Sequence, residues 1–136
     1  MYRKIAGMLF IAALVLPGGC GTGKYADIKN VMEDMIEARE RFIANAGQAR
    51  TPKEAAGAIT TLGTEMKKLR PRYEELEKKY PELQNPESLP LELKELVDAL
   101  GRTAEQRDAE LTNIIMLYPD DAGVQKAVAS TGTVYK

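Results

Sequence analysis

The sequence predicts an all-α fold, namely an antiparallel three-helix bundle of long amphipathic helices. Two observations lead to this prediction. Apolar residues recur every three or four positions through most of the chain after residue 24, and no alternating β-branched run reaches strand length. Three such helices joined by short turns must hide their apolar stripes against one another, and an antiparallel bundle is the simplest way to do so.

The first helix is expected from about Tyr25 to Ala46, where polar residues around Gly47 end it. Its apolar residues recur at helical spacing and form one face: Ile28, Val31, Met32, Met35, Ile36, Phe42 and Ile43. Charged residues, Arg39 among them, are expected on the opposite, solvated side.

The second helix has the clearest start signal. Thr51 is placed at the N-cap, Pro52 at the first helical position and Glu54 three residues after the cap, which together form a capping box. The apolar residues that follow are alternately four and three positions apart, as in a heptad seam: Ala55, Ile59, Leu62, Met66, Leu69, Tyr73, Leu76 and Tyr80. Because such a seam also suits a partner chain, a helical hairpin that oligomerises through it is the alternative.

The third helix is expected to follow a proline-rich turn and to run to about Tyr118. It should bury an apolar stripe: Leu93, Leu96, Val97, Leu100, Ala104, Leu111, Ile114 and Ile115. Arg107 falls close to this stripe, and two interpretations are open: its aliphatic stem packs while its charged head reaches outward, or it marks an edge of the bundle. Asp120 and Asp121 are suitable caps for a short fourth helix, which would hold Val124, Ala127 and Val128.

The first twenty residues carry the features of a secretion signal. Arg3 and Lys4 form a positive start, and the apolar run at 5–16 follows. Twelve helical residues span only about 18 Å, less than the ~30 Å hydrocarbon core of a membrane, so a signal peptide fits better than a membrane span. Residues 17–19, Pro-Gly-Gly, break the helix just before Cys20, the only cysteine.

Residues 16–20, Leu-Pro-Gly-Gly-Cys, resemble the lipobox of bacterial lipoprotein signals, although Pro17 stands where that family usually has leucine. The resemblance covers the first twenty residues. It implies removal of a signal peptide at 1–19 and lipidation of Cys20, with acyl chains such as palmitate that anchor the protein outside the cytoplasm. Gly21, the residue after the cysteine, implies the periplasmic side of the outer membrane in a Gram-negative cell.

The domain organisation follows from these signals. We expect a signal peptide at 1–19, a lipidated cysteine and leash at 20–23, a helical domain at 24–130 and a flexible tail at 131–136. Removal of the signal peptide takes away two of the 19 basic side chains and none of the 20 acidic ones, for a formal charge of −3. This balance provides no basic footprint, so nucleic acid is not an expected partner.

Composition also disfavours an enzyme. The chain has no histidine and one cysteine, which excludes internal disulfides and nearly excludes imidazole or thiolate metal sites. Acidic residues cluster on the first helix and near the end of the second: Glu33, Asp34, Glu37, Glu40, Glu74, Glu75, Glu77 and Glu82. Two-metal sites in ferritin-like bundles need histidines as well, so a solvated face is the interpretation. We expect no cofactor and no metal, and assign no catalytic residue.

The expected role is therefore non-enzymatic: a membrane-anchored cell-envelope lipoprotein that contacts an envelope partner, or a second copy through the second-helix seam. One alternative is a covalent peptidoglycan tether through Lys136, because an N-terminal lipid, helical middle and C-terminal lysine resemble the arrangement of the Braun lipoprotein family at its two ends. The other is a carboxylate-based wall hydrolase, which requires two carboxylates with separated pKa values in a cleft.

Overall fold

The structure is a computed structural model that describes residues 23–131 of the 136-residue chain. This part contains four α-helices and no strand: α1 (Ala26–Gln48), α2 (Pro52–Lys79), α3 (Leu91–Leu117) and α4 (Ala122–Thr131). Two single-turn 3-10 helices connect α2 to α3: η1 (Pro81–Gln84) and η2 (Pro86–Ser88). The all-α prediction is confirmed, and so is the short fourth helix.

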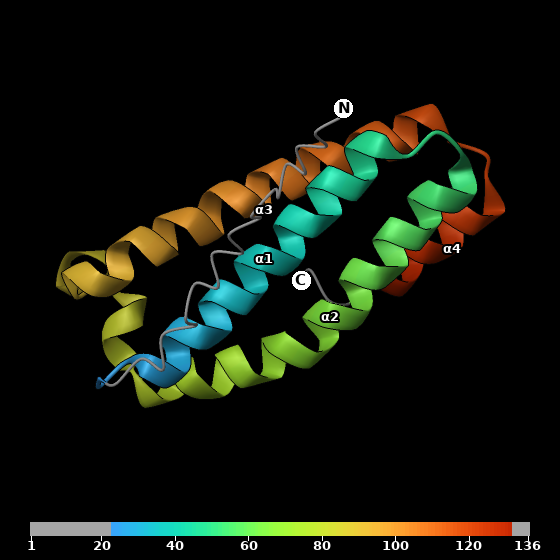
Figure 1. Cartoon of the computed structure of the whole chain (residues 1–136). Helices are drawn as coiled ribbons and strands as arrows, with labels where there is room; N and C mark the ends of the chain where they lie inside the picture. The colour runs from blue at the N-terminus through green and yellow to red at the C-terminus, as the bar shows by residue number, and fades with distance from the viewer. Residues whose placement is uncertain (1–22, 132–136) are drawn as a thin grey trace, which may run out of the picture.

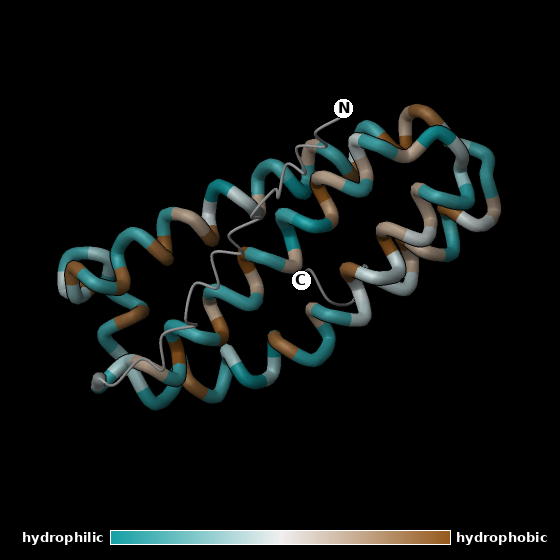
Figure 2. Tube along the Cα trace, in the orientation of Figure 1, coloured by the Kyte–Doolittle hydropathy of each residue, from teal (hydrophilic) through white to brown (hydrophobic). Residues whose placement is uncertain are grey.

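In the bundle, α1 lies between α2 and α3, and α4 packs along α2 (Figure 1). Two contacts give the direction of α2 relative to α1, because Asp27 pairs with Lys79 and Arg41 pairs with Glu65. The start of α1 therefore meets the end of α2, and the two helices run in opposite directions. Hydrophobic and hydrophilic residues alternate turn by turn along each helix (Figure 2), as amphipathic packing requires.

Local start signals behave as the sequence predicts. The Glu54 amide donates to the Thr51 hydroxyl at 3.2 Å, and the Thr51 amide donates to the Glu54 carboxylate at 3.1 Å, which completes the capping box. Asp121 caps α4 by accepting a hydrogen bond from the Val124 amide at 2.9 Å. Both caps depend on residues at most three positions apart.

The core consists of two adjoining clusters. The larger joins α1, α2, α4 and the end of α3: Val31, Met35, Ala38, Phe42, Ala46, Ala55, Ala58, Ile59, Leu62, Met66, Ile114, Val124 and Ala127. The smaller lies where α1 and α3 begin: Tyr25, Ile28, Met32, Tyr80 and Leu93. The first four seam residues of α2 are at most 2% exposed and belong to the larger cluster, so this half of the seam packs within the chain.

The third helix runs in the same direction as α1 and extends beyond it. Lys29 forms an ion pair with Glu92, 63 positions later. Arg39 donates to the backbone carbonyl of Leu100, 61 positions later. Gln48, the last residue of α1, therefore lies level with residues 109–111 of α3. The last two turns of α3 consequently have no α1 residue beside them.

This offset overturns one detail of the predicted core. Ile115, expected to be buried, is 37% exposed, and the next two residues, Met116 and Leu117, are 75% and 69% exposed. Ile114 is buried because it faces the larger cluster. The other apolar residues predicted along α3 are buried or half-buried, as expected.

Two arginines are buried within the helical layers. Arg107 is 8% exposed, and its guanidinium pairs with the exposed Asp108 at 2.7 Å. Arg39 was expected on the solvated side and is also only 8% exposed, so that expectation is wrong. Its guanidinium donates to the Leu100 carbonyl at 2.8 Å, because α3 covers this side of α1.

Substitution of Gly63 by alanine is expected to lower the free energy of unfolding by about 1–3 kcal/mol through overpacking. A Cβ atom at Gly63 would lie 2.4 Å from Thr131 Cγ2. Rotation of Thr131 would break the hydrogen bonds that its hydroxyl donates to the α4 backbone, so α4 must shift away from α2.

The matched control is Gly57→Ala on the same helix, where nothing lies within 4 Å of the added Cβ. This variant is expected to gain about 0.5–1 kcal/mol from helix propensity alone. Urea unfolding measures both changes. If the two variants changed stability in the same direction, the close approach of α2 and α4 would be contradicted.

Candidate functional site

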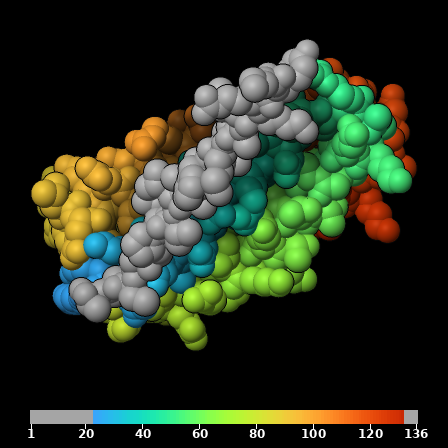
Figure 3. Space-filling view, in the orientation of Figure 1, coloured from blue at the N-terminus to red at the C-terminus, as the bar shows by residue number. Residues whose placement is uncertain are grey.

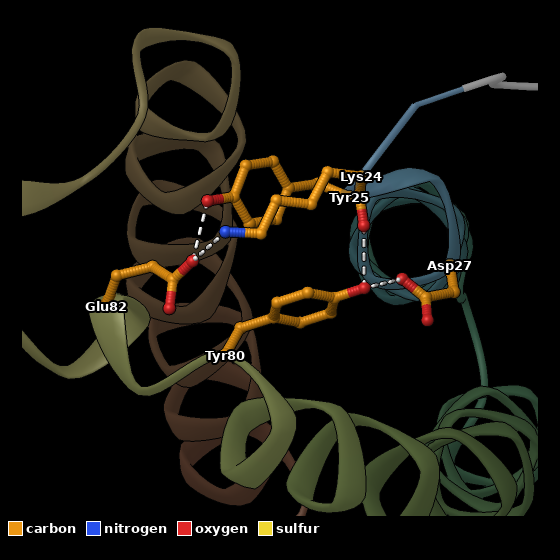
Figure 4. Close-up of polar contacts among 5 residues, drawn as sticks. All are labelled: Lys24, Tyr25, Asp27, Tyr80 and Glu82. Atoms are coloured by element: carbon orange, nitrogen blue, oxygen red, sulfur yellow. Dashed lines mark hydrogen bonds and ion pairs between the residues drawn. The ribbon is translucent and has the colours of Figure 1, made fainter.

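A network of aromatic and charged side chains joins the start of α1 to the end of α2 and to η1. We refer to it as the tyrosine clasp, and it consists of six residues: Lys24, Tyr25, Asp27, Lys79, Tyr80 and Glu82. Figure 4 shows five of them pointing toward one another, three from the start of α1 and two from the end of α2 and η1. In the space-filling view of Figure 3, the blue start of α1 lies beside the green end of α2 and the yellow start of α3.

The two tyrosines exchange hydrogen bonds with each other's segment. Tyr25 Oη donates to Glu82 Oε1 at 2.6 Å, and Tyr80 Oη donates to Asp27 Oδ1 at 2.8 Å. Tyr80 Oη also lies 2.7 Å from the carbonyl oxygen of Lys24, so its single proton is shared between two acceptors. Each acid stands two residues after one tyrosine and accepts from the other.

The two lysines repeat this exchange. Lys24 Nζ pairs with Glu82 at 3.1 Å, and Lys79 Nζ pairs with Asp27 at 2.7 Å. Each ammonium group also lies over the ring of the tyrosine that follows it, 4.9 Å and 5.0 Å from the ring centroid, which is cation–π distance. Each carboxylate therefore binds one tyrosine hydroxyl and one ammonium group of the opposite segment.

The rings of the clasp belong to the core. Tyr25 is 8% exposed and Tyr80 is 4% exposed, and both lie in the smaller cluster. Their centroids are 5.1 Å apart with the planes at 60°, an edge-to-face contact of the kind that stabilises aromatic pairs. The clasp thus combines a packed apolar centre with a charged, accessible rim.

Charge and hydrogen bonding shift the titration of both acids. The hydrogen bond from Tyr25, together with the nearby ammonium group, lowers the pKa of Glu82 from 4.5 to about 2. The ammonium group of Lys79, together with the second tyrosine, holds the pKa of Asp27 below its ordinary value of 3.8. Both acids are therefore charged, and both accept hydrogen bonds, at neutral pH.

The Glu82→Gln variant is expected to be less stable than the wild type at neutral pH and to lose less stability in acid. Because the pKa of Glu82 is lowered by folding, its ionised form contributes stability above pH 4.5, and that contribution is lost as the pH falls toward about 2. Urea midpoints measured at about pH 7 and about pH 3 give the change for each protein.

The control for this prediction is Glu105→Gln, which removes an exposed acid on α3 that lies outside the clasp. It is expected to follow the wild-type midpoints at both pH values. A Glu82→Gln midpoint that falls as far in acid as the wild-type midpoint would show that Glu82 does not stabilise the clasp.

The sequence predicts Tyr80 on the seam and Glu82 in an acidic cluster, but helical spacing does not predict the connection between the two segments of the clasp. A signal was present, because the pattern lysine–tyrosine–any residue–acid occurs twice, at 24–27 and 79–82. Neither copy stands in the middle of a helix: one spans the start of α1 and the other crosses the end of α2 into η1. Helical periodicity, the basis of the prediction, does not register such a pair.

The clasp includes neither of the residues that the sequence predicts as attachment sites. Cys20 and Lys136 fall outside the described residues. The remaining acids of the two predicted clusters are exposed or half-buried, and two of them, Glu37 and Glu74, pair with arginines four positions away. Among residues 23–131, the buried polar or charged side chains are two arginines and two threonines, so no described carboxylate is buried.

Charged side chains also line a hollow of about 410 Å³ between α1 and α2. Three are acidic and three are basic: Asp34, Glu37, Glu65, Arg41, Lys68 and Arg72. Arg41 pairs with both Glu37 and Glu65, so opposite charges balance across the hollow. Within the described part of the chain, no group of three histidine, cysteine, aspartate or glutamate residues is placed to hold a metal ion.

Function must be argued from the chain's own residues. The chain matches no protein-family model, no curated protein and no solved structure. From Gly23 to Thr131, no helix is both long enough and apolar enough to cross a membrane. The donors and acceptors of the clasp are directed at one another rather than at an open cleft.

Proposed function

We propose that this protein is a lipid-anchored protein of the bacterial cell envelope, and that it acts by contact with another envelope protein rather than by catalysis. The observation that carries the proposal is the order of features in residues 1–20, where a basic start, a short apolar run and helix breakers precede the single Cys20. The residue after the cysteine, Gly21, favours the periplasmic side of the outer membrane in a Gram-negative cell.

The described domain supports this proposal at its N-terminal end. Lys24 is joined to η1 by an ion pair and to Tyr80 by its carbonyl oxygen. In the sequence, residues 21–23 alone separate it from Cys20, so the proposed leash is short. A tether attached here therefore pulls on a segment that is already bound to the end of α2 and to η1, and not on an isolated helix end.

We further propose that α1, α2 and α3 form the antiparallel three-helix bundle expected from the sequence, with α4 added along α2. The opposite directions of α1 and α2 support this arrangement, as do the contacts of α1 with both neighbours. The 10-residue α4 packs along the N-terminal half of α2.

A partner other than a second copy is favoured by the burial of the α2 seam. Its first four residues pack inside the chain and would be released only by unfolding. The large apolar side chains that stay exposed in the described part lie at the two ends of α3: Leu91, Ile115, Met116 and Leu117. These are the side chains accessible to an apolar contact.

The experiment that tests the anchor is intact-mass analysis of the protein from the membrane fraction, beside a Cys20→Ala variant. We expect a mature chain that starts at residue 20 and carries acyl mass, and we expect the variant to lack this mass and to leave the membrane. Gly21→Ala, which keeps the cysteine and a small neighbour, is the matched control and should remain acylated. An unmodified full-length chain in the cytosol would overturn the proposal.

A further inference from the structure

On the proposed function, the tether reaches the domain at the start of α1. Tyr25 occupies the N-cap of α1, and its side chain makes no capping hydrogen bond. By contrast, α2 begins with a complete capping box at Thr51. In the first turn of α1, the Ala26 amide donates to the Gly23 carbonyl at 3.2 Å and the Ile28 amide donates to the Asp27 carboxylate at 2.9 Å. These partners belong to the same short segment, so they do not attach it to the rest of the domain.

The tyrosine clasp joins the start of α1 to a part of the chain more than 50 residues away. Tyr80 Oη lies 2.7 Å from the Lys24 carbonyl oxygen, and the Lys24 ammonium group pairs with Glu82 at 3.1 Å. Tyr25 adds its own hydrogen bond to Glu82 at 2.6 Å. Backbone, ammonium group and ring of the entering segment are thus each attached to the end of α2 or to η1.

Burial makes these attachments resistant to separation. The two rings are at least nine-tenths buried and contact each other edge to face, so the entering segment leaves only if an apolar contact opens as well. The ion pairs at the rim are partly exposed and hold the segment less strongly by themselves.

We propose that the tyrosine clasp transmits mechanical tension from the lipid tether to the helical domain. Tension on residue 20 passes through Gly23 to Lys24, and from there through Tyr80 and Glu82 to α2 and η1, so that the first turn of α1 stays folded. This inference rests on the proposed lipid anchor.

Single-molecule force measurements on the full chain test the proposal. The chain is synthesised without membranes so that Cys20, its only cysteine, stays unmodified and takes one handle, while a C-terminal tag takes the other. At the same constant force, Tyr80→Phe is expected to shorten the folded lifetime roughly tenfold, because it removes hydrogen bonds to a charged acceptor and to the backbone.

A second pulling geometry distinguishes transmission of tension by the clasp from a general contribution of the clasp to stability. In a Cys20→Ala, Gly47→Cys background, the handle is attached at residue 47, where an added Cβ meets nothing within 4 Å. The force then acts between residue 47 and the C-terminal tag, so it does not pull directly on the segment at 24–27. Tyr80→Phe is expected to shorten the folded lifetime by less than about threefold in this geometry. Tyr25→Phe, which removes only the hydrogen bond to Glu82, serves as the milder variant if Tyr80→Phe does not fold.

Equal shortening in both geometries would show that the clasp is merely stabilising, and no shortening in the Cys20 geometry would show that it carries no load. Either result overturns the inference. Because the pulled protein is unacylated, these outcomes are independent of the acyl mass that tests the anchor, and failure of one proposal is distinguishable from failure of the other.

Discussion

Truncation of Phe42 to alanine is expected to lower the free energy of unfolding by about 3–5 kcal/mol, the largest effect of any single change considered for this domain. Phe42 is 2% exposed and is the largest of the fully buried side chains in the described part. It lies in the larger cluster, where α1, α2, α4 and the end of α3 meet. The loss combines the transfer free energy of the ring with the cavity that the surrounding helices cannot fill.

The control for this prediction is Phe42→Leu, which keeps an apolar side chain of more similar volume. It is expected to cost less than about 1.5 kcal/mol, because the neighbouring side chains need to move less. Urea unfolding with a common slope gives both values. If Phe42→Ala cost less than about 1 kcal/mol, the larger cluster would not be the packed core that the structure describes.

Leu93→Ala is expected to cost about 2–5 kcal/mol and to weaken the clasp as well. Leu93 is fully buried in the smaller cluster, to which the two clasp tyrosines also belong. Loss of its side chain leaves a cavity in this cluster. Amide hydrogen exchange in the first turn of α1 should therefore accelerate beyond the change expected from global stability alone.

The matched control for Leu93 lies two residues earlier in the same helix. Leu91 is 83% exposed, so Leu91→Ala removes the same atoms from a position that packs against little. It is expected to change stability by no more than about 0.5 kcal/mol. Similar losses for the two variants would contradict the placement of α3 against α1.

The comparison between sequence and structure separates local signals from distant ones. The capping box at Thr51 and the cap at Asp121 were predicted correctly, because each involves residues at most three positions apart. Periodicity also identified most of the buried residues of α1 and α2. It assigned Arg39 to the wrong side, since periodicity does not say how wide a helix face its neighbours will cover.

The candidate site shows the same limit. The lipid site at Cys20 remains a prediction from sequence, because a lipobox is a linear pattern. The clasp was missed, although its repeated four-residue pattern stands in the sequence at 24–27 and 79–82. The two copies form hydrogen bonds and ion pairs with each other only because the α1–α2 hairpin brings them together.

The sequence by itself determined that this chain is helical, where its helices begin, and that its described acids have no histidine to help hold a metal. These properties depend on composition, on caps and on the spacing of residues within one helix. Only the tertiary structure decided that Ile115 is exposed, that α4 approaches α2 at Gly63, and that two tyrosines fasten the start of α1. The physical reason is that each of these contacts depends on the length, direction and offset of a second helix, which no spacing within the first helix encodes.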